Sequence, residues 1–202
     1  MRSLLLVALL SLAAPAFANH PEERLDEVMA ERESAFEPTS LDRLPALDIQ
    51  SAEGELDLDA LEGQIVVLSF VPENCGETCA DQQALLARVQ EAIDVTPMRD
   101  MVSFVSVASP EVSPEGPDAA NWIAAQPREP QTAEALAASF AALSGRDSRL
   151  PMVHVIDRGG RHAGIFHGAE FGHVSMTLYI NGLTNAHPHE PGMFDRVLGV
   201  FQ

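Results

Sequence analysis

The two cysteines, Cys75 and Cys79, are the residues whose type and spacing most clearly indicate chemistry, because they are the only thiols of the chain and stand four positions apart. Residues at i and i+4 lie on one face of a helix, so the two sulfur atoms are expected to be able to form a disulfide or bind one metal ion. Thiolates prefer Cu(I) to harder ions. The pair therefore predicts a redox dithiol or a copper site. A purely structural disulfide is the third interpretation, although so short a loop contributes little stability.

Three carboxylates surround the cysteines and bear on this choice. A helix N-terminus stabilises a nearby thiolate, whereas the negative charges of Glu73, Glu77 and Asp81 destabilise it. The same carboxylates favour a bound cation. The local charge pattern thus favours metal binding over a free, attacking thiolate.

Histidines and methionines in the second half of the chain are candidates for a third metal ligand. His154 is expected inside a strand, on one face with Met152 and Ile156, where a hydrogen-bonded interior histidine competes with the metal-ligand interpretation. His162 and His167 flank the next expected strand and are interpreted as surface residues. Further loose groupings are His173 with Met176, and His187 and His189 with Met193. Any third copper ligand is expected from this set, with His154 as the first choice.

The elements that must position the cysteines can be predicted from the same stretch. Residues 65–70 are apolar and β-branched, which predicts a buried strand, and proline and glycine then indicate a turn. From Cys79 to residue 94 the apolar residues recur at helical spacing. Residues 101–108 predict a second buried strand, and a strand, helix and strand in this order predict a right-handed parallel unit.

The remaining pattern predicts further strands and helices around that unit. Residues 47–62 indicate a hairpin, and 152–156 and 162–166 indicate another, joined by a turn at 157–160. Residues 132–143 predict a helix. A loop with a short helix at 121–125 and a last helix at 193–201 are also expected. The order predicts one α/β domain.

Composition limits the function classes. The chain has 202 residues, a net charge of −18 and no lysine. Its negative charge disfavours binding to nucleic acid or to an anionic membrane surface. The absence of lysine excludes Schiff-base chemistry and a lysine-dependent phosphate loop. The sequence also lacks the hydrolase motifs G-x-S-x-G and H-E-x-x-H.

The N-terminal region predicts export. Residues 1–18 combine Arg2, an apolar run and a small-x-small site, which is typical of a cleaved secretory signal peptide. A periplasmic or secreted protein with no stable membrane span after cleavage is expected, in a compartment that permits disulfides. Residues 19–43 form an acidic N-terminal arm, interpreted as solvated, with an amphipathic helix at 22–34 as the alternative. Residues 44–202 are expected to form the domain.

Three segments resemble one family. VVLSFVPENCGETC, VSFVSVASPE and VHVIDRGGR are similar to motifs of the Sco/SenC family of copper chaperones for cytochrome oxidase, over about residues 44–175. The resemblance implies a thioredoxin-like fold, with a central mixed sheet flanked by helices. It also implies that Cys75 and Cys79 bind copper, or exchange electrons with a partner's disulfide, outside the cytoplasm. The implied partner is a cuproenzyme, such as a cytochrome oxidase subunit, or another thiol-containing exported protein.

Two departures from the family pattern, and one match to another class of protein, keep alternatives open. Ala80 stands where the family usually has proline, and Arg149 stands near the family's third copper ligand, a histidine. Pro151 stands where ordinary thioredoxin-like proteins have a cis-proline facing the dithiol. One alternative is therefore a periplasmic thiol-disulfide oxidoreductase without metal. Another is a binding module with a structural disulfide.

Overall fold

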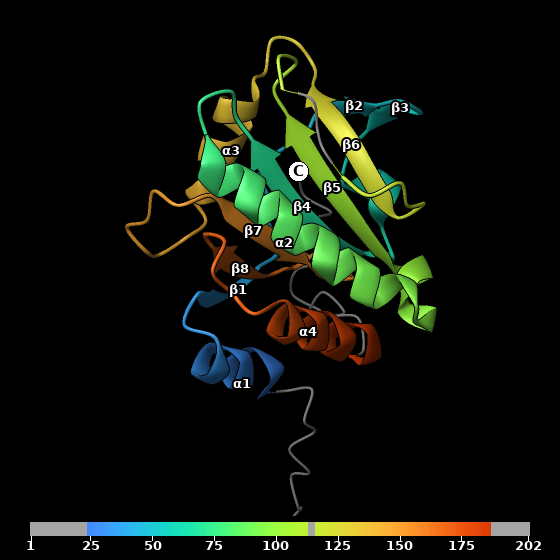
Figure 1. Ribbon diagram of the computed structural model, residues 1–202, viewed down its shortest axis with the longest axis vertical. Coiled ribbons are helices and arrows are strands. Elements are labelled where there is room, and N and C mark those ends of the chain that lie inside the picture. Colours follow the sequence, from blue (N-terminus) through green and yellow to red (C-terminus); the bar gives the residue numbers. More distant parts are fainter. Residues whose placement is uncertain (1–23, 113–115, 187–202) are drawn as a thin grey trace, which may run out of the picture.

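In the part of the chain that the structure describes, a single mixed sheet of eight strands organises the fold (Figure 1). The computed structural model describes residues 24–112 and 116–186. Across the sheet the strands follow the order β1-β8-β7-β4-β5-β6-β2-β3. Their bounds are β1 Phe36–Leu41, β2 Ile49–Ser51, β3 Gly54–Leu56, β4 Ile65–Val71, β5 Val102–Ala108, β6 Trp122–Pro127, β7 Met152–Ile156 and β8 His162–His167.

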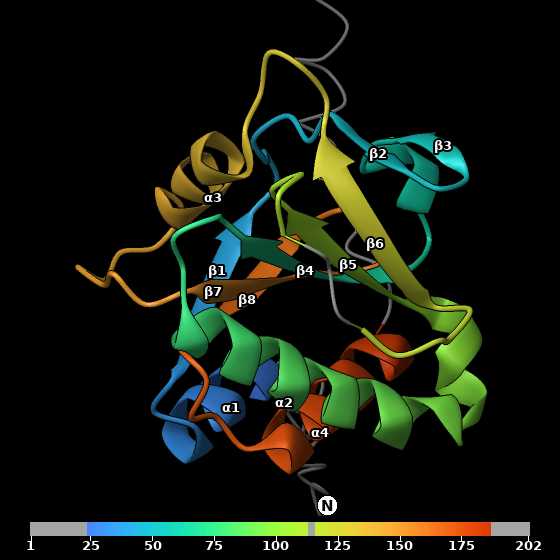
Figure 2. The same cartoon turned by 45° about the horizontal axis from the view of Figure 1, so that its top comes forward.

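Helices cover both faces of this sheet. The helices are α1 Leu25–Arg32, α2 Glu77–Asp94, α3 Ala133–Ala141 and α4 His173–Asn185, with two short 3-10 helices at Asp59–Leu61 and Pro97–Met101. In Figure 2, α1, α2 and α4 lie below the sheet, and α3 lies above it. The face of the sheet covered by α1, α2 and α4 is called the α2/α4 face, and the face covered by α3 is called the α3 face. None of the described helices is long and apolar enough to cross a bilayer.

The strand β4, helix α2 and strand β5 form the predicted parallel unit. β4 and β5 pair in parallel from Ile65 with Val102 to Val71 with Ala108. Both strands are almost entirely buried, because helices cover both of their faces. β7 then pairs antiparallel to β4, and β8 antiparallel to β7, as the second predicted hairpin requires. The hairpin of β2 and β3 is likewise confirmed.

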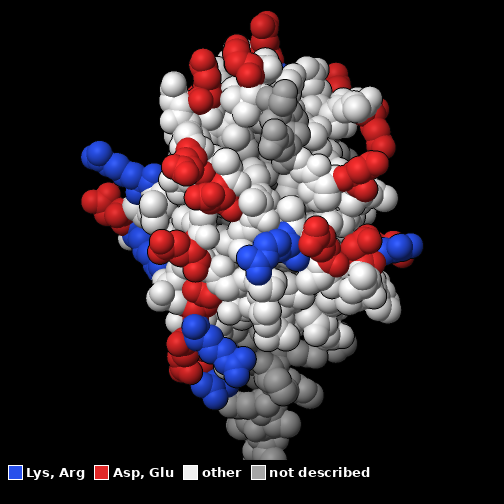
Figure 3. All heavy atoms as spheres, in the orientation of Figure 1, with Lys and Arg blue, Asp and Glu red and all other residues white. Residues whose placement is uncertain are grey.

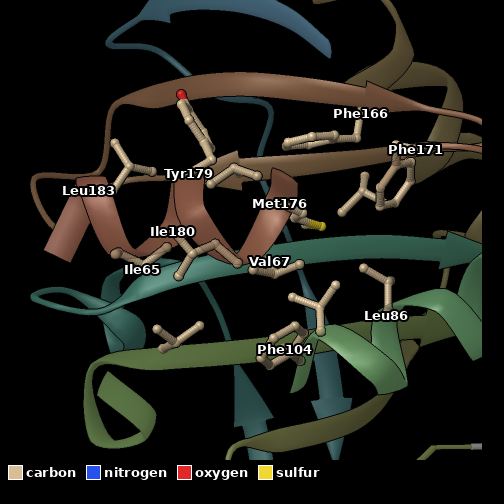
Figure 4. Packing of buried hydrophobic residues seen from close by; sticks show 14 of the residues in the cluster. Ile65, Val67, Leu86, Phe104, Phe166, Phe171, Met176, Tyr179, Ile180 and Leu183 are labelled. Carbon is tan, nitrogen blue, oxygen red and sulfur yellow. The ribbon is translucent and has the colours of Figure 1, made fainter. Parts of the chain in front are cut away.

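Two apolar cores lie on opposite sides of the sheet. The α2/α4 face buries Phe166, Tyr179 and Ile180 against α2 residues such as Leu86 (Figure 4). The α3 face buries a second cluster that joins Leu68 and Phe70 of β4 to Leu136 and Phe140 of α3. The sheet is thus held by apolar packing on both sides.

The segment at 121–125, for which a short helix was expected, is a strand instead. β6 pairs in parallel with β5, from Phe104 with Trp122 to Val107 with Ala125, and antiparallel with β2. Two neighbouring strands therefore satisfy its backbone groups. The ring of Trp122 stacks on Phe104 with 5.7 Å between the ring centroids, which adds packing to the strand conformation.

The described part of the acidic arm is folded rather than solvated. α1 packs against α4, and β1 extends the sheet by pairing with β8. Phe36 on β1 is fully buried and contacts Phe166 and Tyr179. A few apolar residues therefore fix this acidic segment on the domain, and the expectation of a solvated arm is wrong for residues 25–41.

Charge is spread over the surface rather than confined to the arm. Figure 3 shows acidic side chains distributed over the face seen in Figure 1, with basic side chains among them. The expected signal peptide at 1–18 and the expected last helix at 193–201 lie outside the described residues. The helix observed near the C-terminal end is α4.

Candidate functional site

The turn between β4 and α2 carries both cysteines. α2 begins at Glu77, and its N-cap residue Gly76 has φ +69°, a left-handed conformation that glycine adopts without steric cost. Cys75 therefore precedes the helix, and Cys79 lies in its first turn. The expectation that both thiols share one helix face is wrong in this detail, but the Cα atoms are still only 5.7 Å apart.

The two cysteines form a disulfide and differ in exposure. Cys79 is 1% exposed, and its Sγ lies 3.8 Å from the carbonyl oxygen of Phe70. Cys75 is partly exposed and lies at the rim of a groove. An incoming thiolate must reach a sulfur atom along the disulfide axis, so Cys75 is the sulfur open to attack.

Two buried glutamines, which the sequence analysis did not single out, hold the cysteine helix on the sheet. The side-chain amide of Gln82 donates to the carbonyl oxygens of Pro151, at 3.1 Å, and Gly168, at 2.7 Å. Gln83 donates to Ser69 and accepts from the hydroxyl of Ser106. Both follow Cys79 by one helical turn. The sequence signal for these residues was their position among the apolar residues of α2. An amide buried there requires hydrogen-bond partners.

A groove of about 470 Å³ lies beside the disulfide on the α3 face. Cys75, His154, Arg149 and Pro151 are among its lining residues, and small side chains of α3 form another wall. The predicted neighbourhood of Pro151 and the cysteines is therefore present. The only cis peptide bond among the described residues is Glu129–Pro130, so the peptide bond before Pro151 is trans.

His154 is an interior residue that reaches the groove. It is 1% exposed, and the edges of its ring and those of Phe70 and Phe140 pack against one another, with centroids 6.2 and 5.3 Å from that of the imidazole. Its Nδ1 atom is 3.0 Å from Nε2 of His162. Burial, and then the nearby His162 and His167, lower the pKa of His154 well below the ordinary value. The ring is neutral at physiological pH.

His162 and His167 are buried as well, which corrects their interpretation as surface residues. His162 is fully buried on β8, and its Nδ1 atom lies 2.9 Å from the hydroxyl of Thr39 on β1. Burial lowers the pKa of His162 to about 4, opposed by the charge of Glu37 and assisted by that of Arg161. His167 is 6% exposed. β1 packs over these histidines. Their burial was not predicted because β1 lies in the segment that was expected to be a solvated arm.

Glu37 on β1 connects the histidines to the loop that walls the groove. Its carboxylate accepts hydrogen bonds from the hydroxyl of Ser144 and the amide of Gly145, both at 2.7 Å, and lies 2.7 Å from Nε2 of His167. Burial alone would raise the pKa of Glu37, but these hydrogen bonds outweigh it and lower that pKa. The arm therefore fixes the segment that follows α3.

Of the other predicted ligands, the two that the structure describes lie on α4. His173 begins α4 and contacts the guanidinium of Arg88 at 3.1 Å, while Met176 is part of the apolar core on the α2/α4 face. His187, His189 and Met193 lie outside the described residues. Within residues 24–112 and 116–186, no group of three or more His, Cys, Asp and Glu side chains is assembled for a metal ion.

The carboxylates next to the cysteines point to solvent. Glu73, Glu77 and Asp81 are all exposed. A fourth carboxylate, Glu134 of α3, accepts hydrogen bonds from the amide of Glu73 and the hydroxyl of Ser109. Backbone hydrogen bonds, including that from Glu73, lower the pKa of Glu134. The surroundings of the disulfide are thus anionic but well hydrated.

Comparison with known proteins supports the fold. No protein-family model and no curated protein matches the sequence. Among solved structures, the chain is similar to BsSco, a member of the Sco family of cytochrome c oxidase assembly proteins with a disulfide switch. The TM-score is 0.56 at 14% identity, and the match covers 74% of this chain and 98% of BsSco.

Two further similar structures carry the same family name. One is a SCO1/SenC family lipoprotein from Bacillus anthracis, with TM-score 0.55, 16% identity and coverage of 73% of this chain and 98% of that one. The other is copper-bound yeast Sco1, with TM-score 0.55, 11% identity and coverage of 76% and 99%. The resemblance predicted from three motifs therefore extends to the three-dimensional structure, and the fold is α/β and thioredoxin-like.

The arrangement allows two kinds of chemistry. A partly exposed sulfur joined to a buried one, at the rim of an apolar groove, allows exchange with a partner's thiol. Once reduced, the two sulfur atoms are soft ligands, and Cys75 lines the same groove as the neutral imidazole of His154. Thiolate and imidazole are donors suited to Cu(I).

Proposed function

We propose that this chain is an exported, Sco-like protein whose reduced Cys75 and Cys79 bind Cu(I) as cargo and assist the assembly of a cuproenzyme, most directly cytochrome oxidase. The observation that carries the proposal is the pair of cysteines at the β4–α2 turn, with one sulfur at the groove and the other buried. The oxidised pair is then the copper-free state, because a disulfide offers no thiolate.

His154 completes the proposed copper site as third ligand. It lines the same groove as Cys75, whereas the position near the family's histidine is occupied by Arg149, an exposed residue. A neutral imidazole is a common partner of thiolates at copper. Reduction of the disulfide is needed before the two sulfur atoms can bind the ion as thiolates.

The similarity to Sco proteins supports the proposed partner and compartment. The chain shares its fold with BsSco, of a family of cytochrome c oxidase assembly proteins, with a lipoprotein, and with copper-bound yeast Sco1. A signal peptide at 1–18 would deliver the protein to the periplasm or beyond, where the disulfide persists. The proposal thus places copper delivery outside the cytoplasm.

A metal-free thiol-disulfide oxidoreductase is the second candidate. It is favoured by one observation, that Pro151 and Cys75 line the same groove. In that case Cys75 would attack a partner's disulfide and Cys79 would resolve the mixed disulfide, and the two electrons would leave this chain as its own disulfide forms.

A Cu(I) titration of the reduced protein against a competing chelator tests the proposal. We expect one tightly bound ion per chain, loss of this binding in Cys75→Ser, and weaker binding in His154→Phe, which preserves ring volume. His173→Ala is the matched control, because His173 lies on α4, away from the groove, and should bind as the native chain does. Binding no tighter than that of an unstructured dithiol peptide would contradict copper delivery. Exchange with glutathione disulfide would then support the oxidoreductase.

A further inference from the structure

A line of hydrogen bonds runs from β1 through two buried histidines to the dithiol groove. The hydroxyl of Thr39 lies 2.9 Å from Nδ1 of His162 and 2.8 Å from the carbonyl oxygen of the same residue. Nε2 of His162 lies 3.0 Å from Nδ1 of His154, which lines the groove together with Cys75. The line therefore connects the edge of the sheet to the proposed copper site.

The direction of each hydrogen bond follows from the chemistry of the groups. A carbonyl oxygen only accepts, so the single hydroxyl hydrogen of Thr39 is directed to the carbonyl oxygen of His162. Toward Nδ1 of His162 the same hydroxyl must accept, so this Nδ1 carries a hydrogen. In a neutral imidazole the other nitrogen is then an acceptor. Nε2 of His162 thus accepts from Nδ1–H of His154.

This assignment leaves Nε2 of His154 without a hydrogen and with a free lone pair. It is the only assignment in which all three contacts are hydrogen bonds at the same time. The ring cannot turn to exchange its nitrogens easily, because Phe70 and Phe140 pack against it. The imidazole of His154 is therefore fixed in the tautomer whose Nε2 lone pair can coordinate a metal ion.

An irregularity in β8 places His162 where its ring can accept the hydrogen bond from His154. β7 advances one residue, from Val155 to Ile156, while β8 advances two, between Gly164 and His162. Ala163 is the extra residue of a β-bulge. Because side chains alternate between faces, the bulge directs His162 to the α3 face, where His154 lies. β1 is irregular at the same level, between Pro38 and Leu41, and Thr39 lies in that interval.

The chemistry of His154 indicates what the lone pair is for. A neutral imidazole with a free lone pair can bind a metal ion through that nitrogen. Histidine ligands usually donate their second N–H to a neighbouring acceptor, as His154 does to His162.

We propose that Thr39 and His162 are positioning residues that hold His154 in the tautomer whose Nε2 lone pair faces the dithiol groove, and so make it the third Cu(I) ligand. This inference rests on the proposed function. It assigns to β1, part of the acidic arm, a share in the metal site.

Nitrogen-15 NMR of the histidine rings tests the positioning without copper. In the copper-free protein at neutral pH, we expect His154 and His162 to carry their hydrogens on Nδ1, with signals assigned by loss in His154→Phe and His162→Phe. In Thr39→Val, which preserves shape but removes the hydroxyl, the tautomers should become mixed. Thr39→Ser should restore them. A hydrogen on Nε2 of His154 in the native protein would overturn the inference.

Cu(I) affinity tests the second part of the proposal, that this positioning makes His154 a copper ligand. Loss of a partner behind a histidine ligand weakens metal binding about 10- to 100-fold, so we expect at least a tenfold loss of Cu(I) affinity in Thr39→Val and near-native affinity in Thr39→Ser. Native affinity in Thr39→Val, with binding still abolished by Cys75→Ser, would overturn the inference and leave the proposed function intact. Absence of tight binding in the native chain would overturn the proposed function and the ligand role, while NMR would still decide the tautomer.

Discussion

Among the described residues, buried histidines distinguish one face of the central sheet from the other. On the α2/α4 face, aromatic and aliphatic side chains such as Phe36, Phe166 and Tyr179 pack together. On the α3 face, the apolar cluster around Phe70 and Phe140 adjoins His154 and His162. Apolar contacts are non-directional, whereas each buried histidine needs a partner in one position. Both faces supply apolar packing, and the α3 face also restricts geometry next to the cysteines.

The largest effect should come from truncating a ring on the α2/α4 face. Phe166→Ala removes a fully buried ring that contacts Phe36, Phe171 and Tyr179. We expect a loss of about 3–5 kcal/mol in the free energy of unfolding, measured by urea denaturation. Cu(I) affinity of the folded fraction should be unchanged. A change in affinity as large as that of His154→Phe would erase the distinction between the faces.

The second largest effect should be a loss of stability in acid, caused by the buried histidines of the α3 face. The pKa of His162 falls from 6.5 to about 4 on folding, so the unfolded chain binds the proton first as the pH falls. Stability from this residue is complete above about pH 6.5 and decreases toward pH 4. The expected loss between pH 7 and 4 is about 3 kcal/mol, and His154 acts in the same direction.

Urea denaturation of the oxidised, metal-free protein at several pH values between 7 and 5 measures this slope before most carboxylates titrate. His162→Gln should flatten the profile, and His173→Ala should not. A native stability that does not change over this interval would show that the buried histidines are not held neutral by folding.

The smallest expected effect on stability is the difference between replacing one histidine of the buried pair and replacing both. His162→Phe removes the acceptor for Nδ1–H of His154 and the ring N–H that donates to the hydroxyl of Thr39, which should cost about 1–3 kcal/mol at pH 7.5. The double variant His154→Phe and His162→Phe removes both rings with similar shapes and should lose less than the single variant does. Losses that simply add in the double variant would mean that the two histidines are not coupled.

Local sequence pattern was sufficient for the elements that carry the cysteines. Continuous apolar runs predict β4 and β5, and the helical spacing of Leu85, Leu86 and Val89 predicts α2, because these patterns follow from burial on known faces. The same reasoning failed at β6, whose alanines suit a helix. There the pairing with β5 and β2, which the local pattern of β6 does not reveal, decides the conformation.

The site was predictable only in part, and for a related reason. Cys75, Cys79 and the interior position of His154 follow from spacing and strand pattern. The burial of His162 does not, because it depends on a bulge of one residue at Ala163 and on cover from a strand in an acidic segment. Neither feature changes the local composition enough to be recognised without the partner strands.

Glu37 has a consequence for any shortened form of the chain. Composition suggests that the acidic segment ends at residue 43 and can be removed, but the carboxylate of Glu37 secures Ser144 and Gly145 at the start of the loop that leads to Pro151. A fragment beginning at residue 44 would lose β1 and this anchor together, although every residue usually associated with the dithiol would still be present. Its groove would lack a fixed outer wall, so the acidic segment is part of the smallest unit in which the site can be studied.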